Sequence, residues 1–268
     1  MSTTTAPAVS IDTDRPGIPL TRLVGVEVRK AFDTRAGRWL SISILGLCAV
    51  VMLVIAFLVT DGGEFQDFPF FIQAMGGTLG YFLPIIAIML VTSEWGQRTG
   101  LVTFTLEPRR PRVVAAKLLA GLIISVGVML LSAVLAAVGT FLASSVRGVD
   151  VSWSITGHEV FNFAVSNLIG VLIGFAIAML LMNTAAAIVG YFVYTLVLPI
   201  VVGIVGGLVE WFGDLAPWIE LNTALVPLFT GDFDPTGEEW ARIATAGTIW
   251  LVLPLGFGIY RLLRSEVK

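Results

Sequence analysis

Long apolar stretches separated by short polar segments run from residue 39 to the C-terminal region. A helix needs about 20 apolar residues to cross the roughly 30 Å hydrocarbon core of a bilayer. Between Glu159 and Glu210 the chain has 50 residues without a charge, too many for one crossing, so we expect two spans joined by a tight turn at Asn183 and Thr184. The pattern predicts six transmembrane helices, at about 39–60, 68–93, 118–143, 160–182, 185–209 and 243–260.

The segments outside these spans differ in character. Residues 1–19 are rich in Ser, Thr, Ala and Pro, which is typical of a disordered tail, and they lack the apolar core of a secretory signal. Residues 20–38 repeat apolar side chains at helical spacing, with polar ones on the other face. This predicts an amphipathic helix lying in the membrane interface. Residues 20–268, which include this helix and follow the tail, are expected to form a single membrane domain.

Charged and aromatic side chains place the amphipathic helix at the membrane surface. Glu27, Arg29 and Lys30 lie on its polar face, and Trp39 stands where the first span begins. Basic groups are attracted to anionic headgroups, and tryptophan favours the membrane boundary. A solvated helix packed on another subunit would show the same pattern, so both interpretations stay open.

A second short helix is expected before the sixth span. Residues 215–229 are apolar but interrupted by Pro217, Glu220 and Pro227, and an acidic loop follows them. Proline within a helix removes a hydrogen bond and breaks or kinks the helix. The segment is therefore too broken to cross, and we expect a short broken helix on the outer side.

Composition agrees with a protein that folds in lipid. Hydrophobic residues make up 56% of the 268 residues and charged residues 13%, with a mean hydropathy of +0.91, whereas soluble domains carry roughly 25% charged residues. The net charge of −3 gives no sign of a nucleic-acid partner. One cysteine, Cys48, and one histidine, His158, leave no internal disulfide and no cysteine or histidine cluster for a metal.

The distribution of basic residues predicts the orientation of the chain. Of 16 basic residues, only Arg147 and Arg242 fall in the predicted outer loops if both termini are cytoplasmic. This matches the positive-inside rule and favours a multi-pass protein of the plasma membrane with both ends inside. Arginine outnumbers lysine by 13 to 3, which hints at a GC-rich bacterial genome.

The predicted cytoplasmic loop between spans two and three has an unusual composition. It runs from Glu94 to Lys117, is rich in basic residues, and contains a short run of apolar and polar positions at 101–106. Pro108 and Pro111 stop any helix before span three begins. Such a segment joins two spans through little chain, so it is suited to transmit movement; an ordinary basic loop remains the alternative.

The order of residues in this loop resembles the run that follows the second helix of ABC-2 type transporter permeases. That family also has an amphipathic helix before the first span and a broken outer helix before the sixth. The resemblance implies that this region is a coupling segment contacting an ATP-binding subunit. The residues it assigns there are Glu94, Arg98, Thr99, Thr103, Pro108, Arg109, Arg110, Arg112 and Lys117.

The resemblance also implies a composition for the complete transporter. Two permease chains, expected to be a homodimer, would work with two ATPase subunits that bind ATP and Mg²⁺, in an exporter that moves its substrate outward. Homodimer and heterodimer remain open. The chain itself would bind no cofactor and carry no catalytic residue.

Two observations from the residues bear on this expectation. None of the three lysines follows a glycine, so the chain lacks the Gly-Lys pair of a phosphate-binding loop. The span centres carry no Asp, Glu, Lys or Arg, which argues against a proton-coupled carrier. An ATP-independent carrier or channel is the main alternative, and a membrane scaffold or sensor is the second.

Overall fold

The computed structural model describes residues 17–58, 67–96, 100–229 and 235–264. Within these ranges the secondary structure is helical and contains no strand. The prediction of an all-α membrane protein with six spanning helices is confirmed, because six helices in the described ranges are long and apolar enough to cross a bilayer. They are Arg35–Leu58, Phe68–Trp95, Arg110–Arg147, Gly157–Leu181, Thr184–Leu208 and Gly237–Arg264.

The helices are joined end to end by short connections, and the last two spans each contain a π-helical turn. The elements are α1 (Leu20–Asp33), α2 (Arg35–Leu58), α3 (Phe68–Gly96), α4 (Gly100–Leu106), α5 (Arg110–Arg147), α6 (Gly157–Leu181), α7 (Thr184–Phe192), η2 (Val193–Val197), α8 (Leu198–Leu208), α9 (Glu210–Ile219), α10 (Leu221–Phe229), α11 (Gly237–Gly247), η3 (Thr248–Val252) and α12 (Leu253–Arg264). The fifth span comprises α7, η2 and α8, and the sixth comprises α11, η3 and α12.

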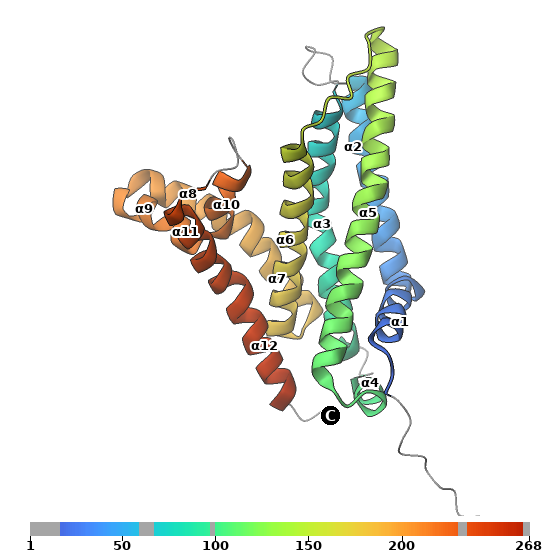
Figure 1. Ribbon diagram of the computed structural model, residues 1–268, viewed down its shortest axis with the longest axis vertical. Helices are drawn as coiled ribbons and strands as arrows, with labels where there is room; N and C mark the ends of the chain where they lie inside the picture. The colour runs from blue at the N-terminus through green and yellow to red at the C-terminus, as the bar shows by residue number, and fades with distance from the viewer. Residues whose placement is uncertain (1–16, 59–66, 97–99, 230–234, 265–268) are drawn as a thin grey trace, which may run out of the picture.

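Helix α3 is the centre of the bundle and packs against α2, α5 and α6 (Figure 1). Its fully buried residues Phe71, Met75, Leu79 and Leu83 recur every fourth position, which places them on one face. On α6, Gly174 lies directly against Pro84 of α3, where an added Cβ would come within 2.7 Å of the proline Cβ. Small residues of this kind allow close helix approach in lipid, where hydrophobicity does not drive association.

The fifth and sixth spans form a second arm beside α6 (Figure 1). Helices α8, α9, α10 and α11 gather at the end of this arm opposite α4, and α12 packs against α6. The two π-helical turns meet through Tyr194 and Trp250, whose ring centroids are 4.8 Å apart. The indole N–H of Trp250 donates to the carbonyl of Ile219 at 2.7 Å, so the same contact also holds the end of α9.

Several helices are longer than the spans expected from hydropathy. Helix α5 has 38 residues, whereas about 20 suffice to cross the hydrocarbon core, so part of the helix extends beyond it. It begins with Pro111 in its first turn and ends at Gly148, which adopts the left-handed conformation at φ 66°. Proline is tolerated at a helix start and glycine at a left-handed cap, so these two residues set the length. Residues 59 and 60 of the expected first span lie outside the described residues.

The turn between the fourth and fifth spans lies where the polar pair indicated. Met182 takes the left-handed conformation at φ 50°, and the Asn183 side chain accepts a hydrogen bond from the Ala186 backbone N–H at 2.9 Å. The asparagine thereby caps the start of α7. A turn this short needs no charged residue, which explains the long uncharged stretch.

The segment before the sixth span is more divided than expected. Instead of one broken helix over 215–229, the chain forms α9, which begins already at Glu210, and α10, with the break at Glu220. Pro217 and Pro227 lie inside these two helices and do not separate them. The break arises because the buried Glu220 side chain accepts hydrogen bonds from the first backbone N–H groups of α10.

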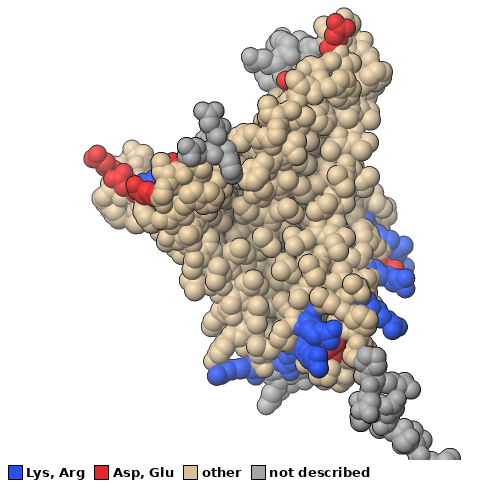
Figure 2. All heavy atoms as spheres, viewed as in Figure 1, with Lys and Arg blue, Asp and Glu red and all other residues tan. Residues whose placement is uncertain are grey.

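Charge is separated along the long axis of the molecule (Figure 2). Lysine and arginine side chains gather at the end that carries α1, α4 and the end of α12, and acidic side chains gather at the opposite end. We call the first of these the basic end and the second the acidic end.

Candidate functional site

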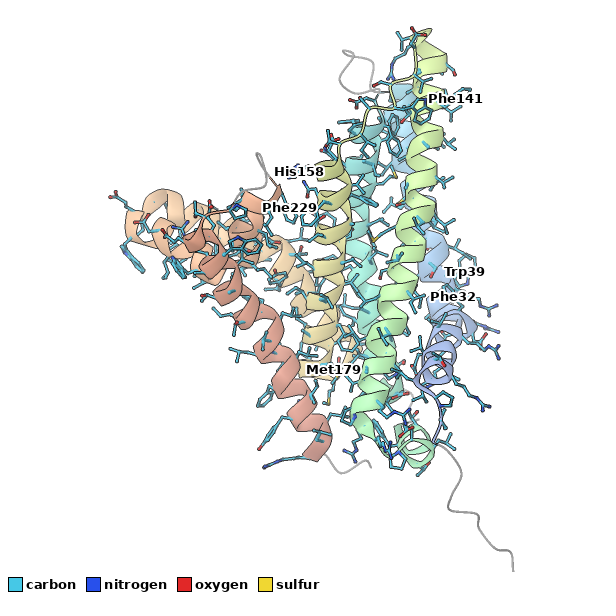
Figure 3. All side chains as sticks on the ribbon, viewed as in Figure 1. Phe32, Trp39, Phe141, His158, Met179 and Phe229 are labelled. Atoms are coloured by element: carbon cyan, nitrogen blue, oxygen red, sulfur yellow. The ribbon has the colours of Figure 1, made fainter. Side chains whose placement is uncertain are left out.

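An elbow joins α1 to α2 at the basic end. The amphipathic helix α1 stops at Thr34, whose hydroxyl oxygen accepts a hydrogen bond from the Gly37 N–H at 3.1 Å. Gly37 must be a glycine, because a Cβ there would lie 1.8 Å from the Ala31 carbonyl oxygen. Phe32 and Trp39 lie at this elbow on the outside of the bundle, and Trp39 is 68% exposed (Figure 3). The elbow therefore lets α1 fold back against the bundle.

Four charged side chains meet where α1 packs against α3 and α5; we call them the ion-pair cluster. Lys117 of α5 lies 2.9 Å from Glu27 of α1 and 3.2 Å from Glu94 of α3. Lys30 of α1 lies 2.7 Å from Glu27 and 3.1 Å from Glu94. Glu27, Glu94 and Lys117 are buried. Each carboxylate thus pairs with both ammonium groups, and the charges balance.

Neutral groups complete the cluster and extend it to α4. The Thr103 hydroxyl of α4 donates to Glu94 Oε1 at 2.9 Å, and Lys117 also donates to the Leu90 carbonyl at 2.9 Å. The remaining Glu94 oxygen, Oε2, is buried and has no hydrogen-bond partner in the described part of the chain. Four helices, α1, α3, α4 and α5, are therefore fastened together at one point.

Because these ion pairs are buried, breaking them would cost much more free energy than breaking ion pairs on the surface. Removing charges from water costs several kcal/mol per ion, and only close pairing with further hydrogen bonds offsets this. Burial lowers the pKa of Lys30, but its interactions with Glu27 and Glu94 outweigh that effect and raise the pKa above its ordinary value. Lys30 is therefore protonated at neutral pH. Its stabilising contribution is fully present below the ordinary lysine pKa and is lost only as the pH rises through the raised value.

The loop between α4 and α5 is tied to both ends of the chain. Glu107 is buried and accepts from Arg112 Nη1 at 3.1 Å, while the other arm of the Arg112 guanidinium donates to the Ile18 carbonyl. Arg110 donates to the Leu262 carbonyl of α12, and its guanidinium lies 5.2 Å from the centre of the Phe104 ring. The loop is thus held against the start of α1 and the end of the sixth span.

The structure divides the residues predicted for the coupling segment into buried and exposed groups. Glu94 and Lys117 were both assigned to the coupling segment, and both are buried in the ion-pair cluster. Pro108 and Arg109 are exposed at the basic end, and Leu106 beside them is 70% exposed. The tip of the loop is therefore accessible at the basic end. Arg98 and Thr99 lie outside the described residues.

The interfacial helix is also arranged differently from the sequence prediction. Arg29 and Trp39 are exposed as expected, and Lys30 is partly exposed. Glu27 was predicted on the polar face of the helix together with Arg29 and Lys30. Its side chain instead points into the bundle and is only 4% exposed. Sequence reasoning also missed Glu107. Its place directly before Pro108, in a loop rich in arginine, was the available signal.

The acidic end also contains a buried carboxylate, Glu220, which is 0% exposed. One of its oxygens accepts from the Asn222 N–H at 3.0 Å and side-chain amide at 2.7 Å, and the other accepts from the Thr223 N–H and hydroxyl, each at 2.6 Å. His158, at the start of α6, donates to the Leu228 carbonyl of α10 at 3.2 Å (Figure 3). These contacts fix α10 between α9 and α6.

Replacing Glu220 with alanine is expected to lower the free energy of unfolding by about 2–3 kcal/mol, because it removes the carboxylate that caps α10 and accepts hydrogen bonds from Asn222 and Thr223. The thermal unfolding midpoint in detergent micelles measures the effect. Glu239→Ala is the matched control, since Glu239 completes a capping box with Thr236 on the exposed surface. Equal losses in the two variants would show that burial of Glu220 adds nothing.

Comparison with known protein families supports the membership of this chain in one of them. A family model described as "ABC-2 family transporter protein" matches residues 29–210. The matched range begins inside α1, includes α4 and the loop after it, and ends at the start of α9. No curated protein matches the chain.

Proposed function

Because the chain belongs to the ABC-2 family of transporter proteins, we propose that it is a permease subunit driven by a separate ATPase, which docks on the loop between α4 and α5. The family is a multi-pass membrane component and is generally not catalytic. Such a subunit transports its substrate by moving its helices. It therefore needs a contact surface through which the ATPase can move them.

The ion-pair cluster is the observation that carries this proposal. A push on the exposed tip at Leu106 and Arg109 would reach α3 through the contact of Thr103 with Glu94, and α5 through Lys117. Breaking one of these buried pairs would leave an uncompensated charge, which costs more than moving the group as a unit. Helices α1, α3, α4 and α5 are therefore expected to move together.

A second route leads from the loop to the sixth span. Arg110 follows the exposed tip directly and donates to Leu262 near the end of α12. Displacement of the loop would thus act on α12 as well as on the bundle. The two arms of the molecule are connected at the basic end by this contact, which supports a rearrangement of the arms as the transport step.

The remaining parts of the proposal follow from charge and exposed surface. The clustering of lysine and arginine at one end supports a cytoplasmic location of that end and of both termini. The excess of arginine over lysine supports the plasma membrane of a bacterium as the location. The most apolar windows of the fifth and sixth spans are only 17% and 11% buried within the chain, which leaves apolar surface for a second copy. We propose a homodimer with two ATPase subunits that bind ATP and Mg²⁺, exporting the substrate.

Photo-crosslinking tests the docking site. A photoreactive amino acid at Leu106 or Arg109 is expected to capture a P-loop ATPase in the native membrane, identified by mass spectrometry, whereas the same group at Val149 is not. Val149 is the matched control because it is 47% exposed in the loop after α5, at the other end of that helix. Equal capture from Val149, or transport by the purified chain alone, would contradict the proposal and favour an ATP-independent carrier.

A further inference from the structure

A cavity of about 700 Å³ lies between α1 and the rest of the bundle at the basic end. Residues of α1 to α5 line it, so it is bounded by the four helices that the ion-pair cluster joins and by α2. Its volume falls within the roughly 300–1,000 Å³ typical of small-molecule sites. Most of the wall is apolar, including Leu23, Val26, Leu40, Ile86, Met89 and Ile124.

The α1 side of the cavity carries exposed positive charge. Arg22, Val26 and Lys30 line it at intervals of four residues, which places them on one helix face. Arg22 is exposed and has no ion pair in the described part of the chain. Lys30 gives two of its three donors to Glu27 and Glu94, and its side chain is 43% exposed. One donor of Lys30 therefore remains for a ligand.

The acidic residues of the wall balance the charge of Lys30 but leave the charge of Arg22 unbalanced. Glu27 and Glu94 are buried and already paired with two lysines, and Glu107 is paired with Arg112. Asp33 is the exposed acid, and it stands in the last turn of α1, away from Arg22. A ligand entering past the first two turns of α1 therefore meets a positive group first and apolar surface beyond it.

The position of the cavity matches the boundary of a bilayer. Gly37 and Leu40 of the elbow line the cavity, and Trp39 between them in the sequence is exposed, as tryptophan is at the membrane interface. Ile86 and Ile124 line the cavity from within the second and third spans. A molecule occupying the whole cavity must therefore have a polar head at the membrane surface and an apolar body in the hydrocarbon region.

We propose that this cavity binds one anionic phospholipid from the adjacent leaflet, with its phosphate on Arg22 and Lys30 and an acyl chain between Met89 and Ile124. A phosphate accepts charge-assisted hydrogen bonds from arginine and lysine, and the acyl chain removes the apolar wall from water. Thr103 and Leu106 of α4 also line the cavity, so the lipid would contact the segment on which docking is proposed. The lipid site itself does not depend on the presence of an ATPase.

Native mass spectrometry of the full-length chain tests the proposal. The protein is purified with equal amounts of phosphatidylglycerol and phosphatidylcholine, and bound lipid is counted as a function of concentration. One phosphatidylglycerol is expected to be retained in preference to phosphatidylcholine. Arg22→Glu is expected to weaken its binding about tenfold, as the loss of one charge-assisted hydrogen bond implies. Met89→Trp places a larger side chain in the apolar part of the cavity and is expected to reduce retention of the lipid as well.

Arg29→Glu provides the matched control, because Arg29 is exposed on α1 but does not line the cavity. Unchanged binding in this variant supports the assigned site. An equal loss in Arg29→Glu and Arg22→Glu would show only general attraction of the lipid to α1, and the proposal would fail. Equal retention of the two lipids, or full retention by Met89→Trp, would overturn it too. Binding that appears only after deletion of residues 1–16 would show that the tail occupies the cavity instead.

Discussion

Replacing Lys117 with methionine is expected to destabilise the protein by about 3–5 kcal/mol, the cost of leaving buried carboxylates with too little positive charge. Lys117 is 3% exposed and pairs with Glu27 and Glu94, which would then share only the partly exposed Lys30. Thermal and denaturant unfolding in detergent micelles measure the loss. Arg242→Met is the control, since it removes an exposed ion pair with Glu238, and such pairs contribute about 0–1 kcal/mol.

A second substitution shows whether the loss in Lys117→Met comes from unpaired charge. Adding Glu27→Gln removes one of the two carboxylates and leaves Glu94 paired with Lys30. The double variant is therefore expected to be more stable than the sum of the two single losses predicts, by about 0.5–3 kcal/mol for residues in direct contact. Strict additivity would mean that Lys117 stabilises the fold by packing alone.

Replacing Gly258 with valine is expected to separate the sixth span from the bundle. A Cβ at this position would lie 2.6 Å from both the carbonyl carbon and the carbonyl oxygen of Met179 on α6. Met179 belongs to the part of α6 that faces α12 at the basic end (Figure 3). Backbone atoms cannot rotate away as a flexible side chain does, so the helices must move apart. We expect a loss of about 3 kcal/mol, the upper part of the range for overpacked sites.

Gly256→Val is the matched control on the same helix, because a Cβ there meets no atom within 4 Å. Both variants add the same side chain to α12 and change helix propensity alike. The difference between their unfolding midpoints therefore isolates the contact with α6. Gly258→Val is also expected to weaken the hydrogen bond between Arg110 and Leu262, which limited proteolysis of the α4–α5 loop would detect. Equal midpoints would show that α12 adjusts without cost.

The sequence alone determined the number and approximate positions of the spans. The bilayer requires about 20 apolar residues for each crossing and internal hydrogen bonds throughout, so length and hydropathy are sufficient criteria. The turn at Asn183 was predictable for a similar reason, because a polar pair interrupts an apolar stretch too long for one crossing. The ends of α5 were not, since charged residues such as Arg110 and Arg147 are compatible with helix beyond the membrane.

The candidate site was only partly predictable. The family resemblance singled out Glu94, Thr103 and Lys117, which the structure brings together, but it gave no means of deciding that two of them are buried. The sequence pattern placed Glu27 and Arg29 on the same polar helix face. The structure turns one inward and leaves the other exposed.

These orientations could not be read from the sequence, because the partners are far apart in the chain. Lys117 is 90 residues from Glu27, and Lys30 is 64 residues from Glu94. The elbow at Thr34 was likewise invisible to hydropathy, since it depends on the fit of Gly37 against Ala31. A bilayer constrains the length and hydropathy of each spanning segment separately, so the spans can be recognised from the local sequence. A buried ion pair depends on the distance between two segments, and that distance exists only after the helices have packed.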